Sequence, residues 1–135
     1  MNVFTLLMLL KTFDLGFYFP RQFVQPFAFL NQVFELKEVA MSPEQLLTVL
    51  LDLETELGRD RSNEPDRVID LDLLYYGSVI RREPRLRLPH PRAHRRPFVL
   101  QSMVELAPSF LHPVLVRTQT ELLVKVRDKT HEDNY

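Results

Sequence analysis

Hydrophobic and polar residues follow two spacings along the chain, and the shorter spacing predicts β-strands. Residues 67–76 (RVIDLDLLYY) form an apolar run with two aspartates one residue apart, and residues 27–36 (FAFLNQVFEL) alternate in part and are rich in Phe and Val. Side chains of a strand point alternately to its two faces, so both segments are predicted to be strands. A turn at residues 77–78 follows, and residues 79–80 are expected to begin a hairpin return.

The longer, helical spacing marks three further segments. One apolar face runs through residues 43–57 and is formed by Leu46, Leu50, Leu53 and Leu57. The preceding SPEQ, residues 42–45, combines an N-cap serine, a proline at the first helical position and a glutamine at N3, which is a capping box. A second helix is expected to open at Pro97 and to stop before Pro108. A second capping box, TQTE, predicts a short helix from residue 118 to about residue 127.

The first residues, MNVFTLLMLLKTF, are almost entirely apolar. Their run from Val3 to Leu10 is far shorter than the roughly 20 residues of a membrane span. No basic stretch precedes it and no small-residue cleavage site follows it, which disfavours a signal peptide. The run is therefore predicted to be a buried strand or a short helix. Residues 128–135 are expected to form a flexible tail.

Composition narrows the class of protein. The 135 residues are 45% hydrophobic and 26% charged, with a net charge of −1 and no cysteine. A chain of this size can fold as one soluble domain, residues 1–135, and the mixture of helices and strands without a βαβ rhythm predicts the α+β class. Disulfides and thiolate metal sites are excluded, and a cytoplasmic protein that binds neither membrane nor nucleic acid is expected.

The acid pair Asp70 and Asp72 is the strongest candidate for chemistry. Residues two apart on a strand share a face, so two carboxylates would lie side by side and disfavour each other's charge unless a cation lies between them. Hard oxygen ligands without a His or Cys cluster favour Mg²⁺. The alternative is a solvated strand edge, which the apolar residues on both sides of the pair make less favourable.

Basic residues flank the acid pair in the sequence. Candidates that could bind phosphate are Arg59, Arg61, Arg67, His90 and Arg96. Two acids for a metal and several arginines for phosphates are the parts that phosphoryl transfer requires. The chain has only three glycines and no phosphate-binding glycine loop, which excludes a P-loop kinase. The alternatives are surface arginines, a loop histidine and, for the seven arginines of residues 81–96, a solvated loop or an RNA contact.

Four motifs in a fixed order resemble one enzyme family. They are G-R-x-R at residues 58–61, R-x-I-D-L-D at 67–72, P-H-P-R at 89–92 and R-x-F-V-L at 96–100. Together they resemble 6-hydroxymethyl-7,8-dihydropterin pyrophosphokinase, an enzyme of folate biosynthesis, over residues 26 to 123. The resemblance implies a ferredoxin-like α+β sandwich around a four-stranded antiparallel sheet.

The resemblance also implies a reaction and a set of site residues. The family transfers pyrophosphate from ATP to the pterin hydroxymethyl oxygen and releases AMP. By position, Asp70 and Asp72 match acids that hold two Mg²⁺ ions, and Arg59 and Arg67 match arginines of a catalytic loop. The positions that match contacts to ATP are Glu54, Arg61, Arg85, His90 and Arg96. The positions that match the pterin pocket are Phe29, Asn31 and Phe98, although Asn31 alone could equally satisfy neighbouring backbone.

The N-terminal region departs from the family pattern. The family opens with a strand of the pattern A-x-G-S-N-L-G and a long helix, and residues 1–25 match neither. The chain is therefore expected to be N-terminally truncated, with the centre of its sheet lost and backbone groups left unpaired. The alternative to an active enzyme is a catalytically impaired remnant that acts as a binding or dimerising module. The oligomeric state is expected to be a monomer or a weak dimer.

Overall fold

The computed structural model describes residues 3–12, 27–57 and 67–132. The elements follow the order β1 (Val3–Thr12), β2 (Phe27–Leu36), α1 (Pro43–Glu56), β3 (Arg67–Tyr76), β4 (Arg81–Arg82), β5 (Arg87–Leu88), α2 (Pro97–Leu106) and α3 (Gln119–Glu132). This is an α+β, ferredoxin-like arrangement, as predicted. The helix α3 continues beyond its predicted end near residue 127, so residues 128–132, expected in a flexible tail, are helical.

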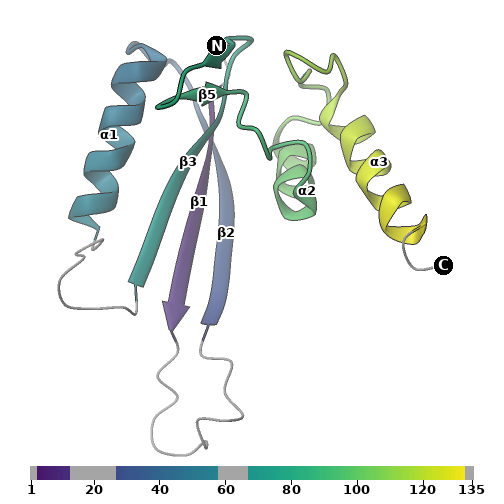
Figure 1. Cartoon of the computed structure of the whole chain (residues 1–135), viewed down its shortest axis with the longest axis horizontal. Helices are drawn as coiled ribbons and strands as arrows, with labels where there is room; N and C mark the ends of the chain where they lie inside the picture. The colour runs from purple at the N-terminus through teal and green to yellow at the C-terminus, as the bar shows by residue number, and fades with distance from the viewer. Residues whose placement is uncertain (1–2, 13–26, 58–66, 133–135) are drawn as a thin grey trace, which may run out of the picture.

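The first strand lies at the centre of the main sheet, whose order is β2-β1-β3 (Figure 1). It pairs antiparallel with β2 from Val3 to Thr12 and with β3 from Val3 to Lys11. The expectation of a lost centre with unpaired backbone groups is therefore wrong. A near-continuous apolar run suits a strand that has neighbours on both sides. Within the described ranges this sheet has three strands, whereas the resemblance implied four.

Helix α1 covers one face of the sheet. Its N-terminus forms the predicted capping box, in which Ser42 Oγ accepts from Gln45 N–H at 3.1 Å and Gln45 Oε1 accepts from Ser42 N–H at 2.9 Å. Leu46 and Leu50 then pack into a cluster with Leu73 of β3. Leucines projecting from one side of a helix in this way bury apolar area against a sheet, which is the main source of helix stability in proteins.

The predicted apolar face of α1 is wrong at its C-terminal end. Leu53 and Leu57 are 38% and 54% exposed, whereas Glu54 is buried. From Leu46 onward the buried positions are four residues apart, and after Leu50 this spacing reaches Glu54. A carboxylate is tolerated there because it accepts a hydrogen bond from the sheet, as described below.

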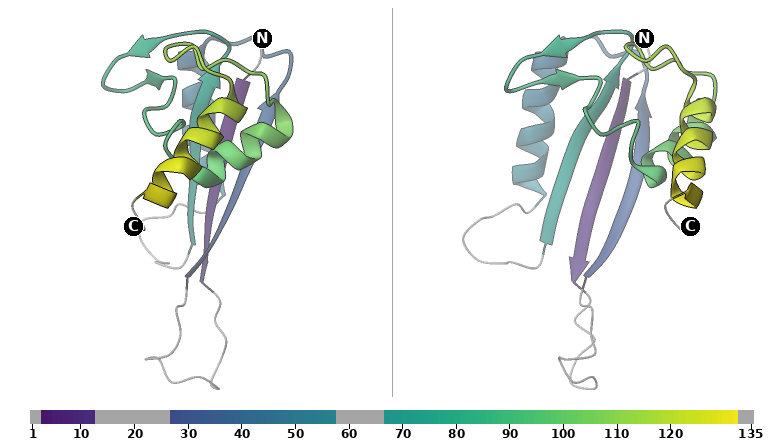
Figure 2. Two further views of the ribbon diagram at one scale, coloured as in Figure 1. Left: turned by 90° about the vertical axis from the view of Figure 1, so that its right-hand side faces the viewer. Right: turned by 45° about the vertical axis from the view of Figure 1, so that its right-hand side comes forward.

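Helices α2 and α3 lie on the other side of the strands (Figure 2). Val99 and Met103 of α2 pack into a cluster with Phe4, Val33 and Tyr75. Leu122 and Leu123 of α3 pack on Leu100 of α2 and complete this layer. None of the helices in the described part of the chain is long and apolar enough to cross a membrane.

A short hairpin crosses the upper end of the sheet in Figure 1 and leads toward α2. Gly77 has a positive φ of 53°, which glycine adopts without steric cost, and it turns the chain out of β3. The return predicted at residues 79–80 begins slightly later, because the paired residues are Arg81 with Leu88 and Arg82 with Arg87. The hairpin and the segment after it bring His90 back to β3.

Candidate functional site

The two aspartates lie on the face of β3 that α2 approaches. In the sheet register, Asp70 pairs with Met8 of β1, and Met8 pairs with Asn31 of β2. Residues directly opposite each other in antiparallel strands share a face, so Asp70 and Asn31 lie on one face, two strands apart. Strand spacing puts their backbones about 10 Å from each other. The structure thus aligns a predicted metal ligand with a predicted pterin contact.

Two basic groups approach the carboxylate of Asp72 from outside the sheet. Nε2 of His90 is 3.9 Å from Asp72 Oδ2, and Nη1 of Arg96 is 3.8 Å from the same oxygen. Both distances exceed hydrogen-bond length, and the buried Nη1 of Arg96 has no hydrogen-bond partner among the described residues. A buried donor of this kind has unfilled capacity for an anionic oxygen.

His90 is oriented by two backbone hydrogen bonds. Its N–H donates to the carbonyl of Leu74 at 2.8 Å, which fixes the segment after β5 against β3. Its Nδ1 accepts from the N–H of Arg92 at 3.1 Å, so in the neutral ring the proton is on Nε2, facing Asp72. The sequence motif P-H-P-R contains Arg92. That the backbone N–H of Arg92 donates to His90 Nδ1 could be found only from the geometry of the turn.

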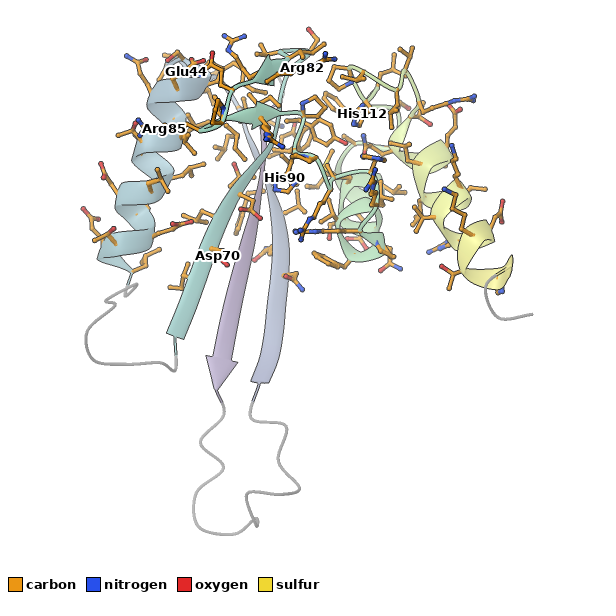
Figure 3. All side chains as sticks on the ribbon, viewed as in Figure 1. Glu44, Asp70, Arg82, Arg85, His90 and His112 are labelled. Carbon is orange, nitrogen blue, oxygen red and sulfur yellow. The ribbon has the colours of Figure 1, made fainter. Side chains whose placement is uncertain are left out.

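The charge state of His90 is set by competing groups. Burial lowers its pKa most, Asp72 raises it, and Arg96 and Arg92 lower it, with a net shift downward from 6.5. The imidazole is therefore neutral at pH 7 and acts as a hydrogen-bond donor through Nε2. Arg96 is the cation next to Asp72. Figure 3 shows Asp70 on β3 and His90 beyond it toward the hairpin.

The acid pair fits magnesium better than other metals. Asp70 and Asp72 are half-buried, and the Asp72 side chain is 33% exposed, so it is open to a ligand. Among the described residues no group of three or more His, Cys, Asp and Glu side chains could hold a metal. Zinc needs such a cluster, whereas Mg²⁺ is usually bound by one or two carboxylates together with substrate phosphates.

The predicted pterin residues come from β2 and α2. Asn31 is exposed and lies on the same face of β2 as Val33, two residues along. Phe98, in the first turn of α2, packs against the cluster that contains Val33. Phe29 lies in β2 opposite Leu10 of β1. Asn31 and Phe98 are therefore on the side of the sheet that carries the aspartates.

Glu54 reaches the edge of β3 from α1. Its Oε1 accepts a hydrogen bond of 2.7 Å from the N–H of Leu71, the residue between the two aspartates. Among the described residues β3 is an outer strand of its sheet, so this amide faces away from β1 and would otherwise lack a partner from the described strands. A link from α1 to the backbone of the acid pair was not predicted from the sequence, because strand-edge amides have no sequence signature.

Of the remaining predicted residues, Arg85 lies apart from the acid pair (Figure 3). Arg85 is exposed in the turn between β4 and β5, and Figure 3 shows it toward α1, away from His90. Arg67 is the first residue of β3 and lies opposite Lys11. Arg59 and Arg61 lie outside the described residues. The assembled part of the site therefore consists of Asp70, Asp72, His90, Arg96, Asn31 and Phe98.

The fold is an α+β domain in which an acid pair and two basic side chains lie on one face of the sheet. A family model described as 7,8-dihydro-6-hydroxymethylpterin-pyrophosphokinase matches residues 12–108, which include every predicted site residue. The chain belongs to this family.

Individual relatives agree with the family model. A 2-amino-4-hydroxy-6-hydroxymethyldihydropteridine pyrophosphokinase of Synechocystis is 39% identical over 89 residues, 65% of this chain and 46% of that protein. A pyrophosphokinase of the same name from Aquifex aeolicus is 34% identical over 87 residues, 64% of this chain and 54% of that protein. A folic acid synthesis protein of Pneumocystis carinii is 38% identical over 96 residues, 70% of this chain and 13% of that protein. The aligned region thus spans about half the length of the two pyrophosphokinases.

Proposed function

We propose that this protein transfers pyrophosphate from ATP to the hydroxymethyl group of 6-hydroxymethyl-7,8-dihydropterin, with release of AMP, as a step of folate biosynthesis. Family membership supports this reaction. The observation that carries the proposal is the position of Arg96 and His90 within 4 Å of Asp72, on the face where Asp70 is in register with Asn31. The acid pair and the cation can bind the metal and phosphates of a nucleotide, and the polar side chain two strands away can contact a second substrate.

The aspartates and their basic neighbours would bind the triphosphate. Asp70 and Asp72 would hold two Mg²⁺ ions, which when bound neutralise phosphate charge and lower the pKa of the attacking hydroxyl. The guanidinium of Arg96 would donate to phosphate oxygens, and its buried, unpartnered Nη1 supports this role. Nε2–H of His90 would donate from the neutral ring without adding charge.

The residues of β2 and α2 would bind the pterin. A pterin is a flat ring with amide-like edges, so the amide of Asn31 can exchange hydrogen bonds with it, while Phe29 and Phe98 offer aromatic faces for stacking. Holding the hydroxymethyl oxygen in line with the β-phosphorus is the main task of such a site. Alignment of this kind can contribute about 7–11 kcal/mol to the barrier reduction.

The same proposal includes the other predicted residues and the setting of the reaction. Glu54, Arg61 and Arg85 would contact ATP, and Arg59 and Arg67 would belong to the catalytic loop. The protein would act in the cytoplasm on small molecules, as a monomer or weak dimer, without nucleic acid. The alternative of an impaired remnant is not favoured, because the acid pair and its basic neighbours are assembled on one face.

The test is AMP formation by the purified chain. With ATP, Mg²⁺ and hydroxymethyl-dihydropterin, we expect AMP by chromatography, and none when either Mg²⁺ or the pterin is left out. Asp70→Ala and Asp72→Ala should reduce the rate below detection, because each removes a metal ligand. Asp128→Ala removes the same charge from the exposed surface of α3 and should leave the rate unchanged. Full activity in Asp72→Ala, or no pterin-dependent AMP from the unmodified chain, would contradict the proposal.

A further inference from the structure

A cavity opens between the β4–β5 hairpin and the loop that precedes α3. Its volume is about 450 Å³, and its lining includes Arg82 and Arg87 of the hairpin and His94, His112 and Leu115 from the segments beyond it. His90 is the one residue of the predicted site that lines it. The wall at residues 112–115 lies outside the range that the family model matches.

Two arginines face each other at the rim of this cavity. Arg82 and Arg87 are directly paired across the hairpin, and both are exposed. Like charges directly opposite each other on neighbouring strands destabilise the pairing. Arg81 is held by Glu44 at 2.8 Å, but neither Arg82 nor Arg87 has an acidic partner in the part of the chain that the structure describes. An anion placed between the two guanidinium groups would relieve this repulsion.

The interior of the cavity is uncharged and partly apolar. Nδ1 of His94 is buried and has no hydrogen-bond partner among the described residues. The His94 ring lies edge-on to His112, with 5.5 Å between the ring centroids. Burial is the main cause that lowers the pKa of both histidines, that of His112 to about 4, so both rings are neutral at pH 7. Ile80 and Leu115 add exposed apolar surface.

We propose that this cavity binds a phosphate monoester with an aromatic or apolar body. The phosphate lies between Arg82 and Arg87, because guanidinium groups match phosphate oxygens in geometry and charge. The uncharged body lies against Ile80 and Leu115, where an acceptor on it can reach Nδ1–H of His94, because Nε2 of His94 already accepts from Nε of Arg95 at 3.3 Å. This binding is separate from the proposed transfer reaction, because the aspartates, Arg96 and the predicted pterin residues do not line the cavity.

The test uses phenyl phosphate as the probe, followed through backbone amide NMR shifts of the full chain. We expect shifts at Arg82, Arg87 and Leu115, and tighter binding than for inorganic phosphate because the ring contacts the apolar wall. Arg87→Glu should weaken binding about tenfold or more, since it removes a charge-assisted hydrogen bond. The same change places opposite charges across the hairpin, so the thermal unfolding midpoint should be unchanged or higher. Arg127→Ala, an exposed arginine of α3, is the matched control and should bind normally.

Three results would overturn the proposal. The first is equal affinity of Arg87→Glu and the unmodified chain for phenyl phosphate. The second is equal affinity of the unmodified chain for phenyl phosphate and inorganic phosphate. The third is loss of phenyl phosphate binding in Asp72→Ala, which would assign the probe to the nucleotide site. Binding that persists in Asp72→Ala supports the proposal even if the chain forms no AMP, so its outcome is separate from that of the transfer reaction.

Discussion

His112 shows how one side chain combines burial with backbone contacts. It is 4% exposed, and its Nδ1 accepts from the N–H groups of Val114 and Leu115 at 3.2 and 3.0 Å. Protonation of Nδ1 would break both hydrogen bonds and leave a charge in a buried position. Burial, together with the nearby His94, therefore lowers the pKa of His112 from 6.5 to about 4.

This shift predicts loss of stability in mild acid. Between pH 6.5 and 4 the unfolded chain binds a proton at His112 that the folded chain does not, so stability is full above pH 6.5 and falls as the pH falls. The loss attributable to this one residue is up to about 3 kcal/mol near pH 4. Urea unfolding at a series of pH values measures it.

The control for this prediction is His112→Asn, whose side-chain oxygen can still accept from the loop amides but does not titrate. The stability of His112→Asn should depend less on pH than that of the unmodified chain. His131→Gln, on the exposed end of α3, should show the same pH dependence as the unmodified chain. Equal pH dependence in His112→Asn and the unmodified chain would contradict this account of His112.

Elements with local signals were predictable, and contacts between elements were not. The capping box at Ser42 located the start of α1, and Pro97 located the start of α2. The buried face of α1 was predicted only in part, because sequence spacing cannot show that Glu54 reaches the Leu71 amide. In the site, Asp70 and Asp72 were predictable from alternation along one strand, whereas the approach of Arg96 depends on tertiary packing.

The Glu54 contact predicts a stability difference between two substitutions. Glu54→Ala leaves a partly buried N–H without its acceptor and should cost about 1–3 kcal/mol, whereas Glu54→Gln keeps a carbonyl acceptor and should cost less. Asp52→Ala, on the exposed side of the same helix, is the matched control. Urea unfolding of the three variants measures the effect, and a Glu54→Ala variant as stable as Asp52→Ala would contradict the link between α1 and β3.

At the scale of the whole molecule, the order of the strands is what the sequence could not provide. The apolar character of residues 3–12 was compatible with a strand or a short helix, and neither possibility identified its neighbours. Pairing of β1 between β2 and β3 is a long-range property that brings Asn31 and Asp70 into one row. Motif order predicted the candidate site residues, and the sheet register determines how those on the strands are arranged.

The central position of β1 predicts that its side chains are essential to the fold. Phe4 is fully buried, and its ring lies 5.0 Å from that of Phe110 and 6.2 Å from that of Tyr75. Phe4→Ala should destabilise the protein by about 3–5 kcal/mol. Phe34→Ala, at a site 39% exposed, should cost much less. Thermal unfolding distinguishes them, and equal midpoints would show that β1 is not part of the core.

We propose that Asp70 and Asp72 bind divalent metal together with ATP, facing His90. The most direct measurement is paramagnetic broadening of amide NMR signals by Mn²⁺ in the presence of ATP, because Mn²⁺ also takes oxygen ligands. We expect the signals of residues 70–72 and His90 to broaden first, and Asp72→Asn to remove the effect. Broadening that is centred elsewhere, or that is unchanged in Asp72→Asn, would contradict this proposal.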